Sequence, residues 1–140
     1  MRQVGMVPTI VGAERSYREE LATFADYGKA RFNLAQLLRR RGDHAGFLAE
    51  LRTSLDRAPE FGPAFFFLAR EELSAGRPDQ AAELAERGLK VDRVTEFVPL
   101  GHYVLADVAT RRGRPAEAQR EVAEARRLEQ ALRRNPPPPF

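Results

Sequence analysis

The two histidines are the first residues to consider for chemistry, because imidazole binds metals and transfers protons near neutral pH. His44 and His102 lie far apart in the chain, and neither has an acidic residue or a second histidine four residues later. The pairs Glu19-Glu20 and Glu71-Glu72 are sequence neighbours, and a helix turns neighbouring side chains about 100° apart. We therefore expect structural histidines, solvated carboxylates, no metal site and no acid–base pair.

The sequence also lacks the common catalytic and cofactor motifs. No G-x-x-x-x-G-K-[ST] loop, no G-x-G-x-x-G loop and no G-x-S-x-G elbow occurs in it. It contains no cysteine, which excludes disulfides, thiolate metal sites and cysteine nucleophiles. We expect no enzyme, no catalytic residue, no cofactor and no small-molecule substrate.

The composition is that of a globular domain. Of the 140 residues, 43% are hydrophobic and 31% are charged, with a net charge of +3. The stretch MRQVGMVPTIVGAE does not have the pattern of a signal peptide, and no run of 18 apolar residues occurs. No membrane span is predicted, and the compartment stays open: the cytoplasm by default, the surface or exterior if the chain is a processed or partial product.

One short pattern recurs along the chain. A Leu-Ala pair is followed by a glycine eight residues after the leucine in three places, at Leu34-Ala35 to Gly42, Leu68-Ala69 to Gly76 and Leu105-Ala106 to Gly113. The glycines are 34 and then 37 residues apart. A nearly fixed period of this length indicates a solenoid of repeated supersecondary units.

The repeats resemble those of the tetratricopeptide repeat (TPR) family, in which a Leu and a small residue precede a turn Gly, a later Ala and a closing Pro. Pro59, Ala81, Ala118 and Ala125 fit that pattern. Four residues depart from it, namely Phe47, Gly88, Arg93 and Gln130. The resemblance implies an all-α fold, a TPR-type α-solenoid forming a right-handed superhelix of about three helix-turn-helix repeats plus an extra N-terminal helix.

The repeats divide the chain into segments. We expect an extended lead-in at 1–12, a solenoid at 13–134 and a Pro-rich tail at 135–140. Within the solenoid we predict a half repeat at 13–26 and repeats at 28–60, 62–93 and 99–133. Helices are predicted at 13–25, 27–41, 44–57, 63–75, 78–91, 99–112 and 115–133. Three extra residues between 92 and 101 predict a longer loop that presents Phe97.

In TPR proteins the first helices of successive repeats line a concave groove, and the resemblance implies a partner-binding site there. Aromatic rings and arginines in such a groove suit a protein or peptide with apolar and acidic side chains. The residues implied are Phe32, Asn33, Gln36, Arg39, Arg40, Phe66, Phe67, Arg70, Tyr103, Asp107 and Arg111.

Two parts of this groove have a second interpretation. The run Phe65-Phe66-Phe67 spans about 200° of a helix, so at least one ring must pack in the core. Phe65 lies on the same helix face as Leu68-Ala69, so we assign it to the core. For Phe66 and Phe67 we favour the groove over the core. The arginines of 39–41 and 111–112 precede turn glycines, where cations also stabilise helix C-termini.

Three functions follow from these patterns. The first is a protein-interaction or scaffold module. The second is a structural subunit that stacks end to end into an oligomer or filament through uncapped ends. The end residues concerned are Tyr17, Leu21, Val122, Leu128 and Leu132. The third and weakest is nucleic-acid binding, suggested by a pI near 9.8 and disfavoured by the evenly interspersed acidic residues.

Overall fold

The computed structural model describes residues 10–23 and 28–136, without the side chains of 10, 11 and 20–23. The expected lead-in therefore lies mostly outside the described residues, as do the side chain of Leu21 and the end of the Pro-rich tail. All regular structure in the described ranges is helical, which confirms the all-α prediction. The helices are α1 (Ile10–Thr23), α2 (Gly28–Arg40), α3 (His44–Arg57), α4 (Gly62–Ser74), α5 (Pro78–Val91), α6 (Val98–Arg111) and α7 (Pro115–Arg134).

Helices α2 to α7 begin and end within one residue of the predicted positions. Local signals explain this agreement. Proline occupies the first turn of each of α4, α5, α6 and α7, where its missing N–H and fixed φ are tolerated. Helix α1 begins at Ile10, earlier than the predicted start at residue 13.

Each repeat turns at its glycine. Gly42, Gly76 and Gly113 have φ values of 81°, 80° and 70°, a left-handed conformation that glycine adopts without steric cost. The N–H of the residue after each glycine donates to a carbonyl five residues earlier, as from Asp43 to Leu38 at 2.9 Å. These bonds satisfy the last carbonyls of each first helix, so the repeating glycine ends the helix and starts the hairpin.

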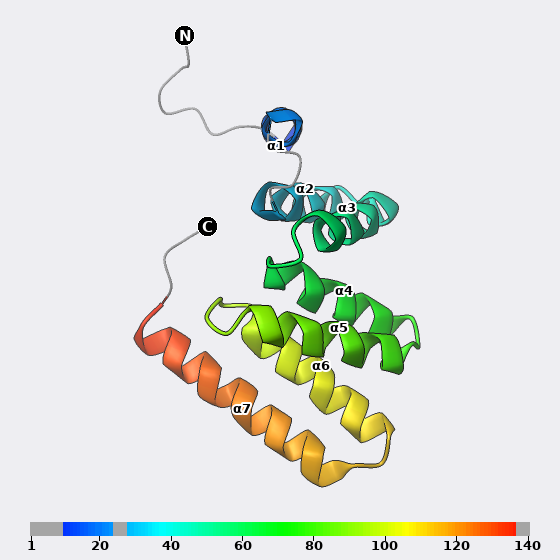
Figure 1. The fold of residues 1–140 in the computed structure, drawn as a ribbon, viewed down its shortest axis with the longest axis vertical. Helices are drawn as coiled ribbons and strands as arrows, with labels where there is room; N and C mark the ends of the chain where they lie inside the picture. The colour runs from blue at the N-terminus through cyan, green and yellow to red at the C-terminus, as the bar shows by residue number, and fades with distance from the viewer. Residues whose placement is uncertain (1–9, 24–27, 137–140) are drawn as a thin grey trace. The chain divides into compact units, whose positions relative to one another are not determined.

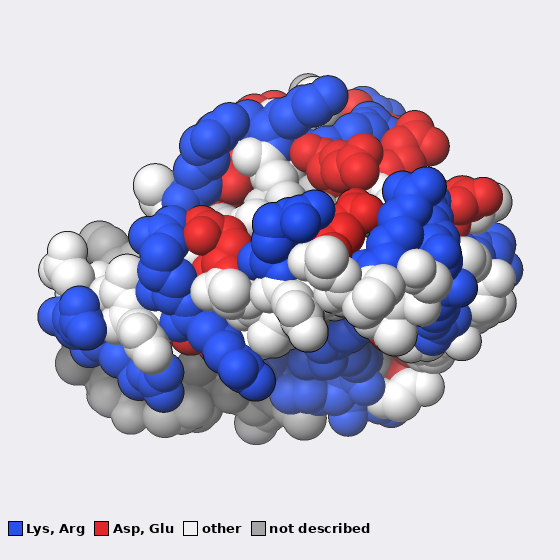
Figure 2. Space-filling model, turned by 90° about the horizontal axis from the view of Figure 1, so that it is seen from below, with Lys and Arg blue, Asp and Glu red and all other residues white. Residues whose placement is uncertain are grey.

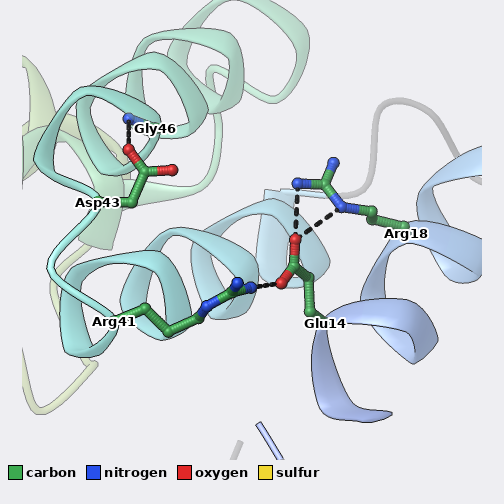
Figure 3. Close-up of polar contacts among 5 residues, drawn as sticks. All are labelled: Glu14, Arg18, Arg41, Asp43 and Gly46. Atoms are coloured by element: carbon green, nitrogen blue, oxygen red, sulfur yellow. Dashed lines mark hydrogen bonds and ion pairs between the residues drawn. The ribbon is translucent and has the colours of Figure 1, made fainter. Parts of the chain in front are cut away.

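The chain forms two compact units, Met1–Ala58 and Pro59–Phe140. In the N-terminal unit, α1 packs on α2 and α2 packs on α3. Tyr17 of α1 lies against buried residues of α2, and Glu14 pairs with Arg18 in its own helix and with Arg41 after α2 (Figure 3). Asp43 caps α3 by accepting the Gly46 N–H at 2.8 Å (Figure 3).

The C-terminal unit consists of two helical hairpins, α4–α5 and α6–α7 (Figure 1). Helix α6 packs on both α4 and α5, so the second hairpin lies against the first. Small and branched apolar residues from α4, α5 and α6 form the core between them. These are Ala69, Leu73, Ala81, Ala82, Ala85, Val104 and Val108.

The ring of Phe66 fills a space that two glycines leave open. A Cβ at Gly88 of α5 would lie 2.6 Å from Phe66 Cε1, and one at Gly101 of α6 would lie 2.7 Å from the same atom. Such contacts are closer than real Cβ atoms make, so both positions need glycine while the ring is present. This explains why Gly88 stands where the repeat pattern has alanine.

The long loop before α6 is fixed by its own side chains. Asp92 is buried, and its carboxylate accepts the N–H groups of Val94 and Thr95 at 3.1 and 3.0 Å. Phe97 packs edge-on against Phe67 with 5.4 Å between ring centroids. Phe97 is therefore half-buried and anchors the loop, and the expectation that the loop presents this ring is corrected.

We predict that Gly88→Ala destabilises the protein, although alanine matches the repeat pattern and is ordinarily about 1 kcal/mol better than glycine inside a helix. The new methyl group would collide with Phe66 and with Phe65 Cβ, 2.8 Å away. Overpacking of this kind costs about 1–3 kcal/mol. Urea unfolding of the two proteins measures the difference.

A double-mutant cycle identifies the cause. In a Phe66→Leu background the ring is gone, so Gly88→Ala should cost less than it does in the wild-type chain. An increase in stability on Gly88→Ala alone would contradict the assignment of Phe66 to this space.

Candidate functional site

The predicted groove residues of the N-terminal unit differ in accessibility. Arg39 and Arg40 are exposed, and Asn33 and Gln36 are half-buried. The Arg39 guanidinium lies 5.7 Å from the centroid of the Phe47 ring, close enough for a cation–π contact. Phe32 is only 3% exposed, so its ring is not available to a ligand, and the expectation for this residue is corrected.

The three phenylalanines of α4 are all buried. Phe65 is in the core as predicted, whereas Phe66 is fully buried between helices and is not a groove residue. Phe67 is 7% exposed and lies beneath Arg70, whose guanidinium is 4.8 Å from the ring centroid. Every residue of Gly62–Ala69 is buried, so this half of α4 has no solvent-facing side on which a ring could be presented.

The accessible part of the predicted groove in the C-terminal unit is polar. Arg111 of α6 donates to the carbonyl of Leu73 in α4 at 3.4 Å, and its Nε lies 3.5 Å from Asp107 Oδ1. Ser74 lies beside that carbonyl, one helical turn after Arg70. We call Arg70, Ser74, Asp107 and Arg111 the α4–α6 strip.

Sequence reasoning named Arg70, Asp107 and Arg111 as binding residues but missed the Leu73 carbonyl as the acceptor for Arg111. No sequence signal marks such a carbonyl, because every residue carries one. The neighbouring Arg112 points elsewhere and donates to Asp79 of α5 at 2.6 Å. Two adjacent arginines thus serve different contacts.

The histidines have local partners. His44 lies 6.0 Å from Phe47 between ring centroids, and His102 Nδ1 is 2.7 Å from Glu121 Oε2. Among the described residues, no three His, Cys, Asp or Glu side chains are grouped as a metal would require. In the same part of the chain, no helix is long and apolar enough to cross a membrane.

A family model described as tetratricopeptide repeat matches residues 12–60 and 68–125, more than half of the chain. The chain belongs to the tetratricopeptide repeat family. The resemblance inferred from the Leu-Ala-to-Gly spacing is confirmed, and so is the fold class of packed TPR helix pairs. TPR repeats generally mediate protein–protein interaction or scaffolding, and the family is typically non-catalytic. No curated protein matches the chain.

The last TPR repeat differs from the one before it on its outer face. Phe66, Leu73, Ala82, Ala85 and Leu89 lie on the face of the α4–α5 hairpin that meets α6. Stepping 37 residues forward from each gives Tyr103, Thr110, Gln119, Val122 and Arg126. Four of these five carry polar groups, so the equivalent face of the α6–α7 hairpin mixes polar side chains with apolar ones such as Val122.

This outer face, which we call the end face, has a hollow of about 670 Å³ whose exposed surface is mostly apolar. Its lining is Thr110, Gly113, Pro115, Ala118, Gln119, Val122, Ala123 and Arg126. Tyr103 belongs to the end face but does not line the hollow, and it donates its hydroxyl hydrogen to Glu129 of α7. Tyr103 was expected in the groove; its hydroxyl instead faces α7.

The other residues predicted for self-association lie elsewhere. Tyr17 packs against α2, and the Leu21 side chain is outside the described residues. Leu128 and Leu132 of α7 are half-buried beside Val98 and the loop before α6. Only Val122 is found in the hollow of the end face.

The hydrogen bond to Glu129 raises the pKa of Tyr103 above its usual value of 10.0, because the phenolate would lose that bond and face a carboxylate. We predict that Glu129→Ala moves the pKa of Tyr103 back down. The raised pKa favours folding at pH values below the ordinary tyrosine range, and this contribution disappears as the pH rises through the raised pKa.

Titration of phenolate absorbance measures this change. Tyr103→Phe is the reference variant, because it removes the rise in absorbance due to Tyr103 and leaves the rises due to the other tyrosines. If Glu129→Ala leaves the titration unchanged, the hydrogen bond does not control this phenol.

Proposed function

We propose that this chain is a protein-interaction module whose α4–α6 strip binds an acidic segment of a partner protein. One observation carries the proposal: Arg70 and Arg111 are both held in position by neighbouring groups. Arg70 lies over the Phe67 ring, and Arg111 is held by Asp107 and by the carbonyl of Leu73.

Held arginines are suited to binding carboxylates. A guanidinium donates two parallel N–H bonds to a carboxylate, with a geometry that a lysine does not offer. Fixing the side chain before binding reduces the conformational entropy lost in the complex. Ser74 is an exposed residue at the end of α4 and adds a hydroxyl to the strip, which therefore has donors on both helices.

The binding test uses an array of acidic peptides, each paired with a version in which Asn and Gln replace Asp and Glu. We predict that the chain binds a subset of the acidic peptides and not their amide versions. Arg70→Ala and Arg111→Ala should each weaken this binding about tenfold or more, since loss of a charge-assisted hydrogen bond costs about 1.5–3 kcal/mol.

Arg112→Ala is the matched control, because this exposed arginine is adjacent in sequence but pairs with Asp79. It should leave peptide affinity unchanged. The proposal is contradicted if the Arg70→Ala and Arg111→Ala proteins bind the acidic peptides as tightly as the wild type does. It is also contradicted if the wild type binds no acidic peptide.

End-to-end stacking is a second candidate, favoured by the hollow around Val122 on the end face. Most of the exposed surface of that hollow is apolar, which suits such a contact. Thr110, Gln119 and Arg126 argue against it, since a tightly stacked interface would bury them without assured partners. Nucleic-acid binding gains less support, because acidic side chains lie among the basic ones on the face drawn in Figure 2.

We predict that the wild-type chain does not self-associate through the end face, and that restoring the residues of the preceding repeat makes it do so. The variant combines Tyr103→Phe, Thr110→Leu, Gln119→Ala and Arg126→Leu. Light scattering over a range of concentrations measures the mass of both proteins. Concentration-dependent growth of the wild type, abolished by Val122→Asp, would favour stacking instead.

A further inference from the structure

Two departures from the repeat period meet in the C-terminal unit. One is the lengthened loop before α6, and the other is α7, which has 20 residues where α3 and α5 have 14. The extended end of α7 lies beside that loop, and together they form a groove of about 260 Å³. Its lining is Arg93, Val94, Thr95, Val98, Leu128, Ala131, Leu132 and Asn135.

This loop–α7 groove continues into a more polar hollow of about 350 Å³, with Arg93, Val98 and Leu128 common to both. The polar hollow adds Lys90 and Asp92 from the end of α5 and Glu124 and Arg127 from α7. One end of the combined groove is therefore apolar, and the other carries charge.

The apolar end includes an unusually exposed side chain. Val94 is 78% exposed and Val91 is 47% exposed, and they are the exposed large hydrophobic residues among those described. Val94 is exposed although the loop is held in place. The Asp92 carboxylate accepts the Val94 N–H, and Phe97 anchors the next turn. Val94 lines the groove together with Val98, Leu128 and Leu132, and contiguous exposed apolar surface marks binding sites more often than single exposed residues do.

The charged end has an excess of available cations. The Glu124 carboxylate accepts from Arg127 Nε at 2.9 Å, and the Asp92 carboxylate is occupied by loop N–H groups. Within the part of the chain that the structure describes, neither Lys90 nor Arg93 forms an ion pair. The positive charge of these two side chains is thus not neutralised by the acids that line the hollow.

From this arrangement we infer that the loop–α7 groove is a second binding site, which takes a short extended segment of a partner protein bearing apolar side chains and a carboxylate. The apolar side chains lie against Val94, Val98, Leu128 and Leu132. The carboxylate lies between Lys90 and Arg93. The distance along α7 from Glu124 to Asn135 is about 16 Å, which accommodates about five extended residues.

This site is separate from the α4–α6 strip, and its chemistry combines apolar and acidic recognition where the strip is purely polar. A nucleic acid is a poorer match, because phosphate chains require several aligned cations. The groove offers two unpaired cations beside the carboxylate of Glu124.

The probe is a phage-displayed library of random seven-residue peptides, selected on the whole chain and then resynthesised with a fluorophore. We expect one recovered class to combine apolar residues with Asp or Glu. Val94→Asp and Arg93→Glu should each weaken that class at least tenfold. Both residues are exposed, so these changes leave the core intact, which thermal melting verifies.

Two controls separate this site from the others. Arg120→Glu makes the same change of charge at an exposed position of α7 outside the groove and should leave affinity unchanged. Arg70→Ala combined with Arg111→Ala removes the strip and should also leave this class bound. Methyl NMR provides a direct readout, since the peptide should shift the signals of Val94, Val98, Leu128 and Leu132.

Several results would overturn the inference. One is that no recovered peptide shifts those methyl signals. Another is that the Val94→Asp and Arg93→Glu proteins bind the peptide as tightly as the wild type does. A third is stronger peptide binding after removal of residues 137–140, which would assign the groove to the chain's own tail. Binding lost only in the strip variants would leave the proposed function standing and reject this second site. Loss only in the groove variants supports the second site, and the strip is then judged by the acidic-peptide array alone.

Discussion

Packing of the Phe66 ring between three helices sets the spacing of the C-terminal unit. The ring projects from α4 toward Gly88 of α5 and Gly101 of α6, where any Cβ would come within 2.7 Å of it. Since close packing tolerates neither a void nor an overlap, ring and glycines must be present together. Farther along the same two helices, Leu73 is in one core cluster with Val104 and Val108, and there Arg111 reaches the carbonyl of Leu73 at 3.4 Å. The geometry of the α4–α6 strip thus depends on core contacts that no ligand would touch.

Equivalent positions of the two hairpins in this unit differ in polarity. The side of the α4–α5 hairpin that meets α6 uses Phe66, Leu73 and Leu89, and the corresponding side of the α6–α7 hairpin has Tyr103, Thr110 and Arg126. The left-handed turn glycine is retained, with φ of 80° at Gly76 and 70° at Gly113, while these side chains change from apolar to polar. A repeat can therefore be used either as an interior layer or as a water-facing one through a few substitutions, and Tyr103 is fitted to the second role by its bond to Glu129.

Local signals made the helices predictable from the sequence, because a proline in the first turn and a left-handed glycine act within a few residues. The placement of Phe66 and Phe67 was not predictable in this way. Neighbouring residues on a helix differ by about 100°, and only the position of α6 and of Phe97 decides which directions are covered. One signal was present: Gly88, standing where the repeat has alanine, is typical of a close approach by another group. The sequence predicted the longer loop and the long last helix that form the loop–α7 groove. It did not predict that they meet, because Val98 and Leu128, which line the groove together, are 30 residues apart.

The division between repeated and exceptional residues separates packing from recognition in this chain. Residues that recur with the period, such as Leu68-Ala69 and Gly76, bury the helices or turn the chain. Residues that occur once, such as Arg70 and Val94, are left accessible to different degrees. An accessible apolar residue is unfavourable in the free protein, and Val94 stays exposed because Asp92 fixes the backbone at that point. The Asp92 turn therefore holds Val94 in the lining of the groove that Leu128 and Leu132 also line.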